Sequence, residues 1–166
     1  METFEEYSKR LRELVGPVDP MEVQANTADV LSRLLADVPD DLLRKPPRPG
    51  KWSVGQILGH LAEGEMVLGY RIRCILANNG CAIEGYDQSR WAEVMQYEEI
   101  APPLSLERFR ALREWNLALL RRLTDEEWKQ FGIHSERGAE SIRDMVALYA
   151  GHDLNHLGQI RAIVSP

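Results

Sequence analysis

The chain has 166 residues, of which 44% are hydrophobic and 28% are charged, a balance that suits a compact domain and excludes disordered and collagen-like proteins. The formal net charge of -6 has the wrong sign for a protein that binds nucleic acid by releasing counterions from phosphates. No apolar run approaches the roughly 20 residues of a membrane span, and the acidic N-terminus is unlike a secretory signal. We therefore expect a single domain over residues 1–166, soluble and cytoplasmic, with no nucleic-acid or membrane partner.

The two cysteines, Cys74 and Cys81, are too few for a disulfide framework, and their spacing matches no zinc or redox motif. Free thiols are expected. A nucleophilic role for Cys74 lacks support, because no His or Asp stands near it in the sequence.

Hydrophobic residues recur at helical spacing almost throughout the chain. A short helix is predicted to open the chain and to stop at residues 16–17, a Gly-Pro pair. Asp19 followed by Pro20 predicts the start of the next helix, because the carboxylate can cap the first turn and proline loses nothing there. That helix is expected to end near Pro39, and the proline-rich residues 46–50 to form a stiff loop.

A capping box of Ser53 and Gln56 predicts a long helix that runs to about Ala77. Residues 78–104 are expected to form a long crossover with a short helix within residues 88–97.

Ser105 is predicted to open the next helix, and Thr124 begins a second capping box. Residues 132–138 are expected to be a loop before Ser141 starts the last helix with Asp144. No alternating strand pattern is visible. Four principal helices predict an all-α fold, a four-helix bundle with a short N-terminal helix and a long crossover connection, and a core over about residues 20–164.

The predicted last helix contains His152 and His156, two imidazoles four residues apart on one helical face. Both continue its apolar stripe, so they are expected to point into the bundle. Such a pair can direct two neutral nitrogens at one divalent metal ion. The spacing also fits two ordinary core or surface histidines, because the motif is short.

A third imidazole favours the metal. His60 lies at the edge of the apolar stripe of the predicted helix at 53–77, and three inward imidazoles need partners to offset their lost hydration. Gly59 and Gly64 beside it, and Gly151 in the last helix, either allow close packing or leave room for a metal with an open coordination position.

Other polar residues near the triad are weaker candidates. Glu63 could reach the metal or orient a ligand from the second shell, although an exposed carboxylate is the alternative. Gln159 could hydrogen-bond in the same pocket. Asp153 is interpreted as structural or interfacial, and His134 as a solvated loop residue.

Three imidazoles favour zinc, nickel, iron, manganese or cobalt over ions that prefer oxygen, with zinc first and nickel second. Three protein ligands leave a position for water or substrate, as in catalytic sites. The ion could activate water for hydrolysis or hold a thiol as its thiolate, and the residues leave both open.

A sequence motif is divided between the two predicted helices that carry the histidines. Its residues are Trp52, Ser53, Gln56, Ile57, His60, Leu61, Glu63, Glu65, His152, Asp153, His156, Gln159 and Ile160. In these residues the chain resembles the DinB-like superfamily of damage-inducible proteins, over roughly residues 20–164. The resemblance implies a four-helix bundle in which His60, His152 and His156 hold zinc or nickel.

Related members include thiol transferases that use bacillithiol, mycothiol or glutathione, a mycothiol-dependent isomerase and metal-dependent hydrolases. The resemblance thus implies an enzyme that activates a low-molecular-weight thiol for S-transfer to electrophiles. The alternatives are a hydrolase that uses metal-bound water, and a non-enzymatic bundle with a structural or vestigial metal site. A homodimer is also implied.

Overall fold

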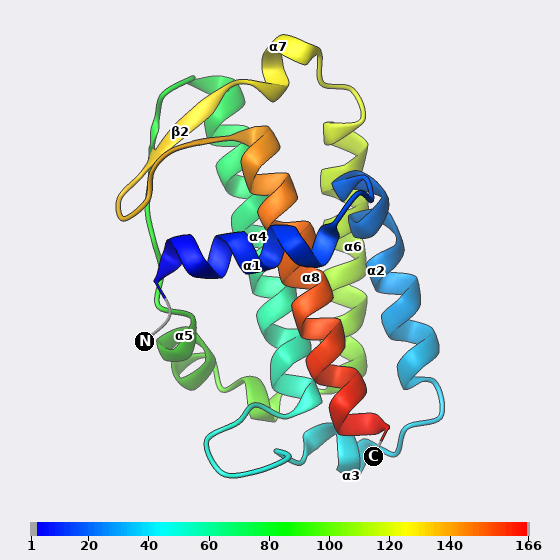
Figure 1. Cartoon of the computed structure of the whole chain (residues 1–166). Helices are drawn as coiled ribbons and strands as arrows, with labels where there is room; N and C mark the ends of the chain where they lie inside the picture. Colours follow the sequence, from blue (N-terminus) through cyan, green and yellow to red (C-terminus); the bar gives the residue numbers. More distant parts are fainter. Residues whose placement is uncertain (1–2, 166) are drawn as a thin grey trace.

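A four-helix bundle forms the body of the protein in the computed structural model, which describes residues 3–165 (Figure 1). Its helices are α2 (Pro20–Leu35), α4 (Val54–Ala77), α6 (Pro102–Leu120) and α8 (Ile142–Val164). α2 and α4 each pack against both α6 and α8. The all-α bundle expected from the sequence is therefore confirmed, and α4 and α8, which carry the candidate histidines, are neighbours.

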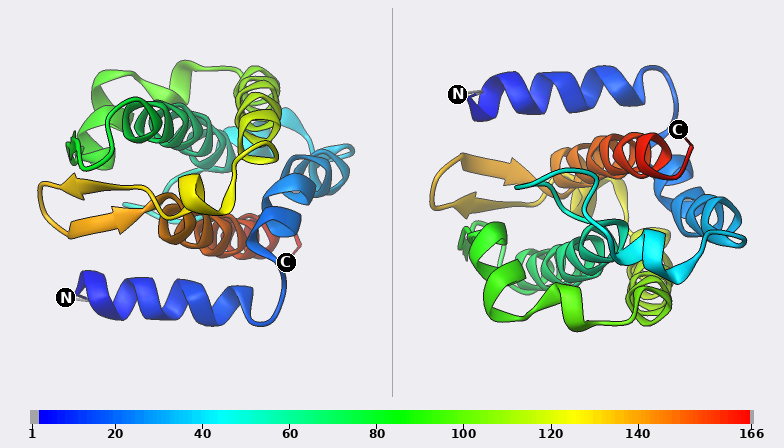
Figure 2. Two further views of the ribbon diagram at one scale, coloured as in Figure 1. Left: turned by 90° about the horizontal axis from the view of Figure 1, so that it is seen from above. Right: turned by 90° about the horizontal axis from the view of Figure 1, so that it is seen from below.

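Shorter elements surround the bundle. α1 (Phe4–Val15) lies outside it and packs across α8, as Figure 2 shows from both ends. α3 (Asp40–Arg44) follows α2, and α7 (Asp125–Trp128) follows α6. The crossover after α4 contains α5 (Gln88–Val94) and the 3₁₀ helix η1 (Tyr97–Glu99), so the expected short helix in this region is present.

A small sheet, which the sequence analysis did not predict, joins the crossover to the segment before α8. β1 (Ala82–Ile83) pairs in parallel with β2 (Phe131–His134), and β2 pairs with β3 (Gly138–Ser141) as an antiparallel hairpin. The expectations of no strand and of a loop over 132–138 are therefore wrong.

The strand signal is hidden because β2 reverses the usual alternation. Phe131 and Ile133 are exposed, whereas Gly132 and His134 are buried. A side chain at Gly132 would collide with Ile83 of β1, so the close approach of the two strands requires glycine.

Most predicted helix starts are confirmed by their caps. Asp19 accepts a hydrogen bond from the amide of Met21, and the capping boxes opened by Ser53, Thr124 and Ser141 all form. Two predicted bounds are wrong. α6 begins at Pro102 rather than Ser105, because its two prolines occupy the first turn, where no amide is needed. The helix at residue 20 ends at Leu35, before the expected Pro39.

The bundle interior consists of two apolar clusters with a polar layer between them. Leu31, Leu58 and Phe109 belong to one cluster, and Leu68 and Ile142 belong to the other. No helix in the described residues is long and apolar enough to cross a membrane.

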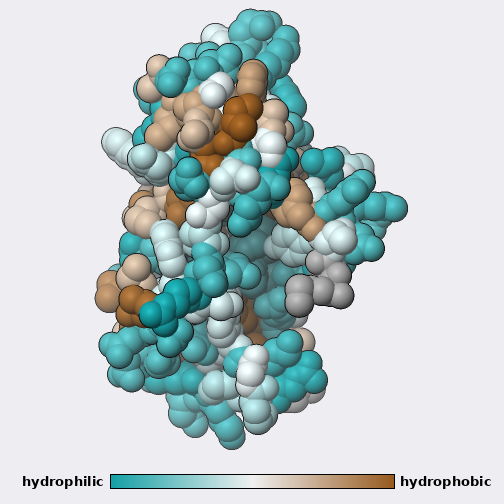
Figure 3. Space-filling view, turned by 90° about the vertical axis from the view of Figure 1, so that its left-hand side faces the viewer, coloured by the Kyte–Doolittle hydropathy of each residue, from teal (hydrophilic) through white to brown (hydrophobic). Residues whose placement is uncertain are grey.

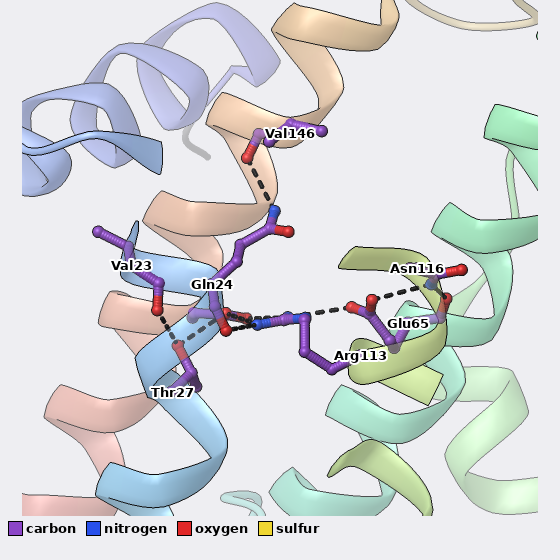
Figure 4. Close-up of polar contacts among 8 residues, drawn as sticks. Val23, Gln24, Thr27, Glu65, Arg113, Asn116 and Val146 are labelled. Carbon is purple, nitrogen blue, oxygen red and sulfur yellow. Dashed lines mark hydrogen bonds and ion pairs between the residues drawn. The ribbon is translucent and has the colours of Figure 1, made fainter. Parts of the chain in front are cut away.

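The polar layer is centred on Arg113 of α6, which is 2% exposed (Figure 4). Its guanidinium pairs with Asp153 Oδ2 at 2.7 Å and with Glu65 Oε2 at 3.0 Å. Thr27 also donates to Asp153, and Asn116 donates to Glu65. These contacts tie together all four bundle helices, so Asp153 has the structural role expected for it.

Candidate metal centre

The structure brings the three candidate imidazoles together between α4 and α8. The Nε2 atom of His152 lies 2.9 Å from Nε2 of His60 and 3.1 Å from Nε2 of His156. His60 and His156 are buried, and His152 is partly exposed. Among the described residues, these three are the group of metal-ligating side chains whose donor atoms converge within 4.8 Å.

Burial keeps these imidazoles neutral. It lowers the pKa of His60 to about 3, with a smaller contribution from His156. Burial also lowers the pKa of His152, and the two other imidazoles and Arg113 lower it further. Burial lowers the pKa of His156 as well, although the hydrogen bond with Gln159 partly opposes this shift. Neutral imidazoles keep the nitrogen lone pairs that a metal ion requires.

Gln159 determines which nitrogen of His156 carries the proton. Its side-chain oxygen lies 3.1 Å from Nδ1 of His156, so Nδ1 donates this hydrogen bond. Nε2 of His156 is then left with its lone pair, directed at the other two rings. The sequence-based candidate Gln159 therefore orients one imidazole of the triad, as partners of metal-binding histidines do.

The donor set fits a divalent metal ion. Nε2 of His152 has close nitrogen neighbours on two sides, and a neutral imidazole, which carries a single proton, cannot satisfy both. A cation at the point where the three nitrogens converge would accept all three lone pairs. Three imidazoles without a carboxylate suit zinc or a later first-row transition metal rather than calcium or magnesium.

Two other sequence-based candidates lie elsewhere. Glu63 is buried, and its carboxylate forms an ion pair with Arg108 at 2.8 Å. Glu63 is therefore neither the exposed carboxylate considered above nor a contact of the three imidazoles. His134 was expected to be solvated, and this is wrong: it is 2% exposed, because β2 directs its side chain inward. Cys74 and Cys81 are free thiols, as expected.

The glycines near the histidines have different roles. A side chain at Gly59 would press against Tyr97 at 3.2 Å, and one at Gly151 would collide with the backbone of Leu11 in α1. Packing therefore explains these two positions. Gly64 differs, since a methyl group there would meet only tyrosine atoms at 3.8 Å or more, and the residue lines a cavity.

This cavity, about 170 Å³ in volume, leads to the triad. His60 and His152 form part of its wall, and Tyr86, Tyr149 and Arg71 form another part. Figure 3 shows the side of the molecule on which the cavity opens, where hydrophilic residues surround a central hollow. A second groove, lined by Trp52 and Gln88 among others, reaches His156.

The tyrosines and the arginine of this wall were not among the residues predicted from the sequence. Tyr149 lies one turn before His152 on the same stripe of α8, and an aromatic residue at this spacing has the pattern of a core residue. Arg71 lies eleven residues after His60, which places both on the same face of α4. Tyr86 comes from the crossover, where the sequence offers no periodic pattern.

Comparisons with known proteins agree with this architecture. The sequence profile of the DinB superfamily matches residues 25–160. YfiT of Bacillus subtilis is 31% identical over 122 residues, which cover 73% of this chain and 68% of the relative. A protein of Oceanobacillus iheyensis is 29% identical over 134 residues, covering 81% and 77% of the two chains. Both relatives are named as probable metal-dependent hydrolases.

Solved structures extend the comparison to the fold. YfiT, described as having an unusual four-helix bundle topology, superimposes with a TM-score of 0.81 and 26% identity over 97% of this chain and 87% of its own. A mycothiol-dependent maleylpyruvate isomerase superimposes with a TM-score of 0.65 over 87% of this chain and 64% of its own, and its 10% identity supports a shared fold alone. The match over residues 25–160 and the similarity to YfiT establish that the chain belongs to the DinB superfamily.

Proposed function

We propose that this protein is a metal-dependent enzyme that acts on small molecules, with His60, His152 and His156 as the ligands of a divalent metal ion. One observation carries the proposal: three neutral imidazoles, two buried and one partly exposed, direct their Nε2 atoms at one point beside a cavity. A bound divalent cation supplies Lewis acidity there, which makes a thiol or a water molecule a better nucleophile at neutral pH.

We propose a low-molecular-weight thiol as the first choice of nucleophile. The carboxylates next to the triad in sequence are already neutralised by arginines, Glu63 by Arg108 and Asp153 by Arg113. These two carboxylates are thus engaged in ion pairs, which makes them poor general bases for attack by water. A thiol is far more acidic than water and needs less help to lose its proton.

The surrounding residues have distinct tasks in this proposal. Gln159 holds His156 in the tautomer that presents Nε2. The rings of Trp52 and Tyr149 pack against His60 and His152, with centroids 5.1 Å and 5.9 Å apart. These contacts limit the rotation of both imidazoles and shield them from water.

The test is turnover of an electrophile by protein loaded with zinc or nickel. Monochlorobimane is offered with bacillithiol, mycothiol, glutathione or cysteine, and we expect a metal-dependent rate with at least one thiol. His152→Ala should abolish this rate, whereas Arg161→Gln, a substitution on the exposed side of α8, should leave it unchanged. Absence of a metal-dependent rate with every thiol would reject S-transfer.

Hydrolysis is the second candidate, because the named relatives are described as probable metal-dependent hydrolases. The same metal-loaded protein, given a panel of esters and amides without thiol, distinguishes the two. Hydrolysis that is lost in His152→Ala, together with no thiol transfer, would favour this alternative. Metal binding without either activity would favour a structural or vestigial site.

Zinc or nickel, a homodimer and a cytoplasmic location complete the proposal. The donor set supports the two metals, and the homodimer rests on the family resemblance. Light scattering of the purified protein measures its mass directly against the 19.0 kDa of one chain.

A further inference from the structure

Arg71 is a buried cation that forms no ion pair with the described residues, although its guanidinium lies 6.0 Å from the ring centroid of Tyr86. Its residue on α4 is 5% exposed, and no carboxylate of the described residues lies within ion-pair distance of its guanidinium. The other fully buried arginine, Arg113, has two such carboxylates. Arg71 instead donates to the backbone carbonyl of Glu84 and lies close to His134. A buried charge without a counterion is costly, so the position calls for an anion.

His134 adds a second donor at the same place. The backbone amide of Glu136 donates to Nδ1 of His134 at 3.2 Å, so Nδ1 carries the lone pair and Nε2 carries the proton of the neutral ring. Burial, with help from Arg137 and Arg71, lowers the pKa of His134 and keeps the ring neutral. Nε2 of His134 nevertheless lies 3.3 Å from Nη2 of Arg71.

Both of these nitrogens are therefore donors, and they face each other without an acceptor between them. An oxygen atom that accepts from both would resolve this conflict. An oxyanion would also neutralise the charge of Arg71, which a water molecule would not.

The two donors line the cavity that reaches the triad. His60, Gly64 and Arg71 lie on one face of α4, and the eleven residues from His60 to Arg71 span about 16 Å along the helix axis. The cavity is therefore lined both by imidazoles of the triad and by Arg71, whose backbone lies about three turns further along α4. Tyr86 and Tyr149 line it as well.

The remaining charges at the rim do not compensate Arg71. The carboxylate of Glu140 is already neutralised, because each of its oxygens accepts a hydrogen bond from Arg137 at 2.7 Å. Glu136 also lines the cavity, but its residue is exposed, so water screens its charge.

We infer that Arg71 and His134 form a subsite for an oxyanion, a carboxylate or phosphate group of a small molecule whose other end reaches the histidine triad. The class of substrate is thus an anionic metabolite. Anion binding by these residues stands without the metal. That the anion belongs to the substrate rests on the proposed function.

The test is a titration of the full-length, zinc-loaded protein with succinate, inorganic phosphate and, as a neutral match for succinate, succinamide. Heteronuclear NMR follows the Nε–Hε signal of Arg71 and the ring nitrogens of His134. We expect saturable shifts of both with at least one anion and none with succinamide. A response to phosphate alone or to succinate alone identifies which oxyanion the subsite takes.

Variants separate this subsite from the metal. Arg71→Gln should weaken anion binding by about tenfold or more, because it removes a charge-assisted hydrogen bond, and His134→Gln should weaken it as well. Arg161→Gln, which also removes one positive charge, should have no effect. Circular dichroism verifies that each variant is folded.

Unchanged affinity in both Arg71→Gln and His134→Gln would overturn the inference. So would the absence of saturable binding, or shifts confined to the rings of the triad, which would place the anion on the metal. The same titration of chelator-treated protein distinguishes the two proposals: binding retained without metal supports the subsite even if the metal-dependent activity fails.

Discussion

Removing the cation of the buried polar layer should be among the most damaging single substitutions in this protein. In Arg113→Met, the side chain keeps much of its length but loses its contacts with Asp153, Glu65 and the carbonyl oxygen of Gln24. Both carboxylates are about 1% exposed, so water cannot replace the guanidinium.

Breaking a buried ion pair from one side costs about 3–5 kcal/mol. Asp153 would keep its bond from Thr27, and Glu65 its bond from Asn116, so neither carboxylate would lose every partner. We therefore expect Arg113→Met to lower the free energy of unfolding by about 3–5 kcal/mol. For a chain of this length that corresponds to a fall in Tm of roughly 6–20 °C.

The assay is urea denaturation followed by circular dichroism, with Arg110→Met as the matched control. Arg110 lies one turn earlier on α6, and its ion pair with Asp29 is exposed, so the control should lose less than about 1 kcal/mol. A variant that combines Arg113→Met with Glu65→Gln and Asp153→Asn should recover part of the loss, because no unpaired charge then remains. A loss below about 1 kcal/mol in Arg113→Met would refute the reasoning.

Further predictions concern the histidine-bearing helices. Gly151→Ala should destabilise the protein by about 1–3 kcal/mol in the same assay, because the added methyl group collides with α1. Gly158→Ala, with open space around the residue, should stabilise the protein by about 0.5–1 kcal/mol. Equal effects of the two substitutions would contradict the close packing of α1 against Gly151. In metal-free protein, the imidazole of His60 is protonated in the unfolded chain as the pH falls from about 7.5 to 5, but in the folded chain its pKa of about 3 keeps it neutral, so the free energy of unfolding should decrease by about 2 kcal/mol. In urea titrations, His60→Ala should show a decrease over the same pH range that is smaller by this amount. Equal decreases in the variant and the wild type would show that His60 is not held neutral. Gln159→Ala should weaken metal binding by about tenfold in a competition with a chelator, because it removes the acceptor of an imidazole N–H; unchanged affinity would mean that this bond does not orient the ring.

The helices were predictable because their signals are local. The capping boxes at Ser53 and Ser141 and the Asp19-Pro20 start each lie within a few residues of sequence, and all three form. The small sheet was not predictable in this way. Its central strand buries Gly132 and His134 while Phe131 and Ile133 face outward, which reverses the alternation that marks a strand.

The convergence of the histidines was also predictable in part. His152 and His156 share a helical face by their spacing, and His60 follows the inward stripe of its own helix. The role of Gln159 follows from the same spacing, since it lies three residues after His156. The environment of Glu63 was not predictable, because Arg108, its partner, lies on another helix and 45 residues away.

The part of the cavity around Arg71 depends on tertiary structure alone. Arg71, Tyr86 and His134 come from α4, the crossover and the hairpin, and no sequence pattern links them. The burial of Arg71 and His134 arises from the packing of the crossover and the hairpin against α4.

The measurement that tests the central claim most directly is the metal content of the protein, purified without a metal-binding tag, alongside His60→Ala, His152→Ala and His156→Ala. His134→Ala serves as the control, because this buried histidine lies outside the triad. We predict about one zinc or nickel ion per chain in the wild type and in the control, and loss of the metal in each triad variant. Wild-type protein that is metal-free and rebinds no divalent ion, or triad variants that keep a full complement, would contradict the account.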